Sequence, residues 1–269
     1  MNEAKGTALI TGGSTGIGAI YADRLARQGY DLILVARNAA KLDQVAATIR
    51  TATGRNVDTV PADLSNPGEL RLIEARLIND RRITMLVNNA GIGAPVPTWQ
   101  ADIDQMESMI DINATALARL TYAVAQRFAA AGNGTIINIA STVAIAPEFM
   151  LNGVYGATKA FVVALTASLH AELADKGVRV QVVLPGATAT EFWDLSGVPL
   201  SGVPAEIVMS ADAMVDAALA GLELGETVTI PALPDAAEWT AFEAARTAML
   251  PNLSLTNPAD RYRAVAAAA

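Results

Sequence analysis

Short runs rich in β-branched residues alternate with longer amphipathic segments along most of this chain of 269 residues. Residues 32–35 and 136–139 are almost continuously apolar, which is typical of strands covered on both faces. Because strand–helix–strand units cross over with one hand, the alternation predicts a doubly wound parallel α/β sheet. Strands are expected at 7–11, 31–36, 56–61, 83–88, 135–140, 178–184 and 227–231, and helices at 17–28, 39–52, 67–80, 102–130, 153–175 and 211–224.

Two segments depart from this alternation. Residues 187–210 hold several glycines and prolines around Phe192 and Trp193. Loops of this length in a compact domain are usually functional lids or disordered, and the apolar aromatics favour a lid. We therefore expect a substrate loop or lid at 187–210 and a C-terminal extension at 234–269. Nothing of linker composition divides the chain, so residues 1–269 are expected to form a single domain.

Composition excludes several function classes. The net charge is −8 with no basic cluster, so nucleic acid is not an expected partner. The chain has no cysteine and one histidine, so no metal site is expected. No apolar run reaches the roughly 18 residues that span a bilayer, and the N-terminus lacks a signal-peptide core. We expect a cytoplasmic protein without a membrane segment.

A glycine-rich turn follows the first predicted strand. Gly12, Gly16 and Gly18 are spaced G-x3-G-x-G and lead into a helix, a context that lets backbone N–H groups approach a dinucleotide pyrophosphate. The second strand ends at Arg37 with no carboxylate, and a guanidinium suits a 2′-phosphate better than a ribose hydroxyl. This favours NADP(H), with NAD as the alternative. The alternative is that Arg37 is a solvated surface arginine with no role in cofactor binding.

Three side chains near the middle of the chain suggest proton transfer. Tyr155 and Lys159 stand one helical turn apart and share a helix face. A phenol is a poor base at neutral pH, and a nearby ammonium would stabilise its ionised form and lower its pKa. Ser141, after the strand at 135–140, could hydrogen-bond the same substrate oxygen. The alternatives are a packing pair and a serine that caps a turn; the only histidine, His170, is interpreted as structural.

Taken together, these motifs resemble the short-chain dehydrogenase/reductase family over residues 7 to about 231. The matching residues, in order, are Thr11, Gly12, Gly16, Ile17, Gly18, Asp63, Leu64, Asn88, Asn89, Ala90, Gly91, Asn113, Ser141, Tyr155, Lys159, Pro185, Gly186 and Thr188. The resemblance implies a three-layer Rossmann-like fold with a seven-stranded parallel sheet and helices on both faces. It also implies a homodimer or homotetramer.

The resemblance further implies roles for individual residues. Asp63 would lie near the adenine, and Asn89, Ala90 and Gly91 beside the cofactor ribose. Lys159 would bind the nicotinamide ribose, and Thr188 the carboxamide. Asn113 would hold a water that links Lys159 to solvent. Ser14 and Thr15, also assigned to cofactor binding, occupy turn positions where some NADP-dependent members carry a second basic residue, which leaves Arg37 as the cation there.

The function expected from these residues is hydride transfer between NADP(H) and a carbonyl or alcohol. The substrate surface is expected at 93–96, 148–150 and 192–200, where Phe149, Met150, Phe192 and Trp193 are apolar and Glu148 is ionisable. An apolar small-molecule ketone, aldehyde or alcohol would suit it. Two alternatives stay open: an epimerase or dehydratase on the same scaffold, and a non-catalytic protein that senses dinucleotides.

Overall fold

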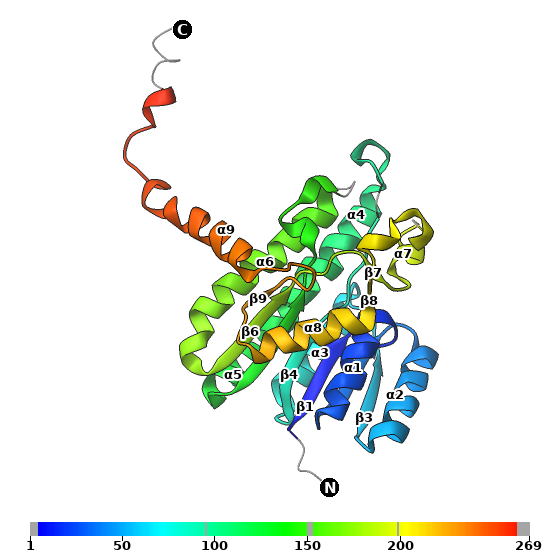
Figure 1. Cartoon of the computed structure of the whole chain (residues 1–269). Helices are drawn as coiled ribbons and strands as arrows, with labels where there is room; N and C mark the ends of the chain where they lie inside the picture. The colour runs from blue at the N-terminus through cyan, green and yellow to red at the C-terminus, as the bar shows by residue number, and fades with distance from the viewer. Residues whose placement is uncertain (1–4, 95, 150–152, 198, 263–269) are drawn as a thin grey trace. The chain divides into compact units, whose positions relative to one another are not determined.

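The computed structural model describes residues 5–94, 96–149, 153–197 and 199–262. Its centre is a seven-stranded parallel sheet in the order β3-β2-β1-β4-β5-β6-β9 (Figure 1). The strands are β1 (Thr7–Thr11), β2 (Asp31–Ala36), β3 (Val57–Pro61), β4 (Ile83–Asn88), β5 (Gly134–Ile139), β6 (Val178–Val183) and β9 (Val228–Thr229). The strand order reverses between β1 and β4, which opens a crevice at the carboxyl ends of the strands. The predicted parallel sheet is confirmed.

Helices cover both faces of this sheet. One layer contains α1 (Gly16–Arg27), α2 (Ala39–Thr53) and α8 (Ala211–Glu223); the other contains α3 (Pro67–Asn79), α5 (Leu117–Ala131) and α6 (Gly153–Leu173). Side chains of β1 alternate between the layers: Ile10 packs with the first and Leu9 with the second. Each such fully buried side chain contributes about 1.5–3 kcal/mol. The two apolar layers therefore fix the sheet from both sides.

A row of buried polar side chains crosses the second layer. The Asn88 amide donates to Thr121 Oγ1 and to Asn138 Oδ1, both at 2.9 Å, and the Asn138 amide donates to Thr166 Oγ1 at 2.9 Å. Buried amides are costly unless they are bonded, so the row specifies how α5, β4, β5 and α6 fit together. Since α6 carries Tyr155 and Lys159, the row also positions the candidate site.

The predicted helix at 102–130 is interrupted. The structure has α4 (Ile103–Ile110), then a π-helical segment over Asp111–Ala116, then α5. A π-helical turn shifts the helix face by one residue, and such turns are frequent at functional sites. This interruption could not be predicted, because the apolar pattern of an ordinary helix continues on both sides of it. Asn113 lies inside this segment.

The chain divides into two compact units, Met1–Pro231 and Ala232–Ala269. In the first, the predicted loop at 187–210 contains β7 (Thr188–Ala189) paired with β8 (Met209–Ser210), and α7 (Phe192–Leu195). The second contains α9 (Ala236–Ala248), for which the sequence analysis predicted no helix; Asp235 caps it by accepting from the Ala237 N–H at 2.8 Å. No helix in the described residues is long and apolar enough to cross a membrane.

Candidate active site

The glycine turn between β1 and α1 has the open geometry that a phosphate group requires. Gly12 and Gly16 take left-handed backbone angles, with φ of 67° and 52°. A Cβ on Gly18 would collide with the Gly12 carbonyl oxygen. Within the described residues, the Thr15 side chain does not cap α1 and no acidic side chain lies in its first turn. The N–H groups and positive dipole end of α1 are therefore available to an anion.

The ends of β1 and β4 are bonded to each other beneath this turn. Thr11 Oγ1 accepts the N–H groups of Asn89 and Ala90, both at 3.0 Å. The Asn89 amide donates to the carbonyls of Thr11 at 2.9 Å and Gly12 at 3.3 Å. Asn89 therefore holds the shape of the glycine turn through its side chain, a structural task that its motif alone does not reveal.

The carboxyl ends of β2 and β3 hold the residues predicted to bind adenosine. Asp63 Oδ1 accepts from the Ser65 N–H at 2.9 Å and its hydroxyl at 2.7 Å. Burial opposes ionisation of Asp63, but the Ser65 bonds and the charge of Arg37 outweigh it and lower the pKa of this carboxyl. The Leu64 side chain is buried in the core, and Ile17 packs against the opposite core cluster. Arg37, in contrast to these two side chains, is exposed.

Tyr155 and Ser141 meet where β5 ends and α6 begins. Ser141 is the second residue after β5, and its hydroxyl hydrogen-bonds the Tyr155 phenol. The Tyr155 side chain is almost fully buried, and burial raises its pKa to about 12, while the Ser141 bond acts in the opposite direction. The net shift of the Tyr155 pKa is therefore upward, because desolvation of the phenolate dominates, and the lowering effect expected from Lys159 stays a prediction.

Lys159 lies one turn further along α6, also buried. Its Nζ donates to the Ile139 carbonyl at 3.0 Å and lies 5.7 Å from the centroid of the Tyr155 ring. Burial lowers the pKa of Lys159 to about 8. A Cβ on Gly91 would lie 3.1 Å from Asn113 Oδ1, which is a tight contact, and 3.4 Å from this Nζ, which is an ordinary one.

Asn113 is held by the backbone of the chain segment after β4. Its Oδ1 accepts the Ile92 N–H and its Nδ2 donates to the Ile92 carbonyl, both at 2.9 Å. The same Nδ2 donates to Thr158 Oγ1 at 3.2 Å, which joins the π-helical segment to α6. Asn113 thus fixes the segment that passes Lys159. The relay water expected at Asn113 stays a prediction.

The segment after β6 brings an aromatic side chain to the tyrosine. The ring centroids of Phe192 and Tyr155 are 5.9 Å apart, and the Phe192 ring packs against Gly93. The Trp193 indole N–H donates to the Thr188 carbonyl at 2.9 Å, and Thr188 Oγ1 donates to the Gly186 carbonyl at 3.1 Å. These two hydrogen bonds therefore stabilise the loop that contains residues 188–193.

Several other residues of the prediction can be placed. The Pro185 carbonyl accepts from the Thr142 N–H at 2.9 Å, which joins the segment after β6 to the one after β5. Glu148 is exposed. Met150 and the side chain of Phe149 lie outside the described residues. His170 contacts Thr227 Oγ1 at 3.3 Å and is about 22 Å along α6 from Tyr155 by helical rise, so it does not join this cluster.

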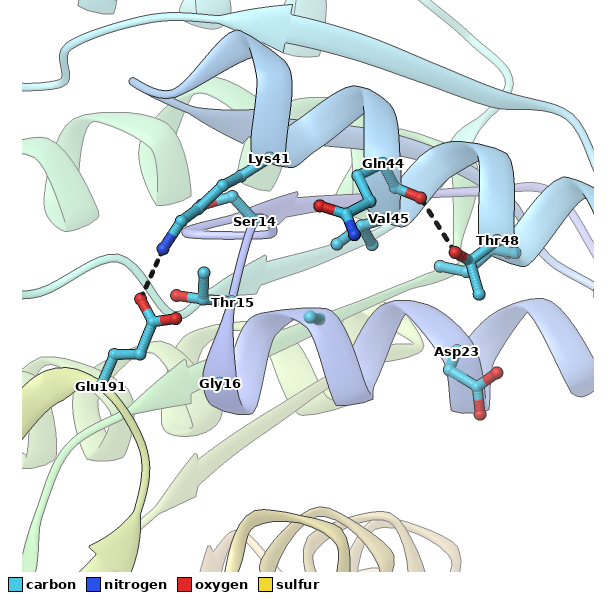
Figure 2. A pocket seen from close by; sticks show the side chains of 11 residues that line it. Ser14, Thr15, Gly16, Asp23, Lys41, Gln44, Val45, Thr48 and Glu191 are labelled. Atoms are coloured by element: carbon cyan, nitrogen blue, oxygen red, sulfur yellow. Dashed lines mark hydrogen bonds and ion pairs between the residues drawn. The ribbon is translucent and has the colours of Figure 1, made fainter.

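The sequence analysis missed two charged residues beside the glycine turn. A cavity of about 440 Å³ between α1 and α2 is lined by Ser14, Thr15 and Gly16, and by Lys41 and Glu191 (Figure 2). Lys41 Nζ and Glu191 Oε2 form an ion pair at 2.7 Å. Lys41 follows Arg37 by four residues, and this spacing could have predicted a second cation close to the end of β2. Glu191 is 150 residues away in sequence, and no local pattern connects it to Lys41.

Comparison with known proteins places this arrangement among relatives. The family model described as short chain dehydrogenase matches residues 6–197. A very-long-chain 3-oxoacyl-CoA reductase of Danio rerio is 35% identical over 69% of this chain and 59% of its own length. The human 17-beta-hydroxysteroid dehydrogenase type 3 is 34% identical over 68% of this chain and 59% of its own. The chain thus spans about three fifths of the length of these relatives.

Solved structures match over more of the chain. A short-chain dehydrogenase from Sphingobium yanoikuyae in complex with NADPH is 47% identical with a TM-score of 0.92, covering 96% of this chain and 100% of that one. The bulky-bulky ketone specific alcohol dehydrogenase from Comamonas testosteroni is 41% identical with a TM-score of 0.88, covering 97% and 99%. The range that the family model matches, residues 6–197, contains the glycine turn, Ser141, Tyr155 and Lys159. The chain belongs to the short-chain dehydrogenase/reductase family of NAD(P)-dependent enzymes.

Proposed function

We propose that this enzyme interconverts an apolar carbonyl compound and its alcohol, with NADP(H) preferred over NAD(H). The observation that carries the proposal is the buried Tyr155 hydroxyl, hydrogen-bonded to Ser141 with Lys159 on the same helix face. Two similar proteins support it: one was solved with NADPH, and the other is named for its ketone specificity.

The residues at the crevice fit a nicotinamide dinucleotide. The open N-terminus of α1 and the glycine turn suit its pyrophosphate, and Arg37 suits a 2′-phosphate because no carboxylate stands at the end of β2. Asp63 would lie near the adenine, and Lys159 near the nicotinamide ribose. When bound, the nicotinamide supplies a hydride to the substrate carbon or removes one from it.

In the reducing direction, Tyr155 is the proton donor. A pKa raised to about 12 keeps the phenol protonated at neutral pH, so its O–H is available to the carbonyl oxygen. As the substrate carbon gains hydride, its oxygen gains negative charge and takes the proton from Tyr155 Oη. The O–H bond of Tyr155 breaks, an alcohol O–H forms, and the tyrosine is left as a phenolate.

Ser141 and Lys159 act on either side of this transfer. The Ser141 hydroxyl, which bonds the phenol in the free enzyme, can donate to the same substrate oxygen and hold it in line. Lys159 places a positive charge within 5.7 Å of the phenol ring, which stabilises the phenolate once it forms. Asn113 positions the neighbouring segment through Ile92.

The apolar substrate class rests on the position of Phe192. Its ring packs against Tyr155 and Gly93, so a substrate oxygen that reaches Tyr155 lies beside an aromatic surface.

Two aromatic side chains on the outer helices, Tyr122 on α5 and Phe161 on α6, are exposed. They support self-association as a homodimer or homotetramer.

The direct test is consumption of NADPH with a panel of aromatic, cyclic and aliphatic ketones and aldehydes, with NADH in parallel. Turnover of at least one carbonyl, faster with NADPH, is the expected result. Tight NADPH binding without any turnover, in both reaction directions, would contradict the proposal and favour a dinucleotide sensor.

A further inference from the structure

The cavity beside the glycine turn is lined by a cation, Lys41, to which the proposed function assigns no role. Among the described residues that line this cavity, Lys41 is the only cation, and it faces Ser14 and Thr15 from the first turn of α2 (Figure 2). The backbone of Lys41 is fixed because its N–H donates to Asn38 Oδ1 at 3.0 Å, the cap of α2. This cap fixes the backbone of Lys41, which is the third residue of α2 and follows Arg37 by four residues.

The end of β2 is where a Rossmann-like sheet distinguishes a ribose hydroxyl from a 2′-phosphate. Arg37 stands at this strand end, and its charge acts on Asp63 on the side of β3. Lys41 lines the same cavity as Ser14 and Thr15 of the glycine turn (Figure 2). Two cations, Arg37 and Lys41, thus follow β2 within five residues, although the glycine turn itself carries no basic residue.

In the structure, Lys41 already has an anionic partner. Glu191 Oε2 lies 2.7 Å from its Nζ, and both side chains are about half exposed, at 45% and 51%. Exposed pairs of this kind contribute little to stability. A phosphate monoester carries close to two negative charges and several acceptor oxygens, so it competes effectively with one carboxylate for the same ammonium.

Resting on the proposed function, we propose that Lys41 is a second ligand of the cofactor 2′-phosphate. Until the cofactor binds, Glu191 forms an ion pair with the Lys41 ammonium. Glu191 and the phosphate cannot both remain against this ammonium without strong repulsion, so binding of NADP(H) releases Glu191. NAD(H), which has no 2′-phosphate, leaves the ion pair in place. The exchange makes Lys41 a determinant of cofactor specificity.

The exchange of partners at Glu191 also affects the residues that line the substrate surface. Glu191 directly precedes Phe192, the ring that packs on Tyr155, and Trp193, which is bonded to Thr188. A change of partner at Glu191 therefore moves the start of α7. Binding of the 2′-phosphate is coupled in this way to the aromatic surface of the active site.

The test is equilibrium binding of NADPH and NADH to four proteins: wild type, Lys41→Gln, Glu191→Gln and the control Lys176→Gln, an exposed lysine near the end of α6. Lys41→Gln should weaken NADPH about tenfold, the scale of one charge-assisted contact, and change NADH less than twofold. Glu191→Gln should tighten NADPH severalfold and leave NADH unchanged. The control should match wild type.

Each contrary outcome identifies what has failed. NADPH affinity in Lys41→Gln equal to that of the control, or equal losses for NADPH and NADH, would overturn this proposal alone. Weaker NADPH binding in Glu191→Gln would also overturn it, since the carboxylate would then be helping the phosphate. A wild-type protein that binds neither dinucleotide would overturn both this inference and the proposed function.

A second measurement tests the coupling without turnover. Replacing Trp99 and Trp239 by Phe leaves Trp193 as the only tryptophan of the three in the chain. Adenosine 2′,5′-bisphosphate should change Trp193 emission, while ADP, which lacks the 2′-phosphate, should not. The change should disappear in Glu191→Gln. The same response to both nucleotides would overturn the coupling.

Discussion

The Lys159 ammonium donates a hydrogen bond to the Ile139 carbonyl at 3.0 Å, at the last residue of β5. This bond holds a charge inside the protein at the point where the sheet opens into the crevice. Burial lowers the pKa of Lys159 to about 8, so the protein keeps this ammonium at a cost to its own stability. The arrangement makes sense as a device for catalysis rather than for folding.

Replacing Lys159 by methionine should therefore stabilise the protein and impair function. The chain loses a buried charge and keeps the side-chain volume, so the free energy of unfolding at pH 7 should rise by about 1–3 kcal/mol. Urea unfolding measures this change, and turnover measured in parallel should fall. A less stable variant would contradict the assigned cost of burial.

The same residue gives stability a defined pH dependence. Because the folded-state pKa of Lys159 is depressed, the unfolded chain binds more protons between about pH 8 and the ordinary lysine pKa. Stability should rise with pH across this window in the wild type. In Lys159→Met this rise should be absent. Parallel pH profiles for the two proteins would exclude Lys159 as its source.

The buried polar row should depend on Thr166. Thr166→Val removes the acceptor of the Asn138 amide and leaves a buried donor unpaired, which costs about 1–3 kcal/mol. Thr51→Val is the matched control, since Thr51 also bonds the carbonyl four residues earlier in its helix but is exposed. Chemical denaturation should separate the two variants. Equal losses would show that the row contributes nothing specific.

The glycine turn should tolerate no side chain at position 18. Gly18→Ala introduces a Cβ against the Gly12 carbonyl, so the turn must distort and dinucleotide binding should fall by at least tenfold. Gly202→Ala is the control, because a Cβ there meets no atom of the described residues within 4 Å. Calorimetric titration with NADPH compares the two. Normal binding by Gly18→Ala would separate the turn from the cofactor.

Phe192 should affect the substrate more than the cofactor. Phe192→Ala removes the ring beside Tyr155, so KM for an apolar ketone should rise several-fold while NADPH affinity stays the same. Steady-state kinetics with a large and a small ketone measures the effect. An equal change for both ketones would place Phe192 outside the substrate surface.

Most of the sheet could be predicted because its strands are short β-branched runs bounded by glycine and polar residues. The bounds of β1, β2 and β4 agree with the prediction, and those of β3, β5 and β6 differ by one residue. The π-helical segment around Asn113 could not be predicted, since its apolar periodicity matches that of an ordinary helix. Helix α9 was missed because Trp239 and Phe242 are its only large apolar residues, and none of its residues is buried.

The candidate site likewise contains residues that could be predicted from the sequence and features that depend on the folded chain. Tyr155 and Lys159 could be found because their spacing places them on one helix face, and Ser141 because it follows a predicted strand. The direction of the Tyr155 pKa could not, since it depends on burial by elements distant in sequence. The pairing of Lys41 with Glu191 likewise requires the folded chain.

The measurement that tests the central claim most directly compares Tyr155→Phe with the wild type. NADPH affinity and ketone turnover should be determined on the same samples. Loss of a general acid predicts that turnover falls by about 10²–10⁴-fold while the Kd for NADPH changes little. Turnover retained at the wild-type level would contradict the role of Tyr155 as proton donor and, with it, the proposed mechanism.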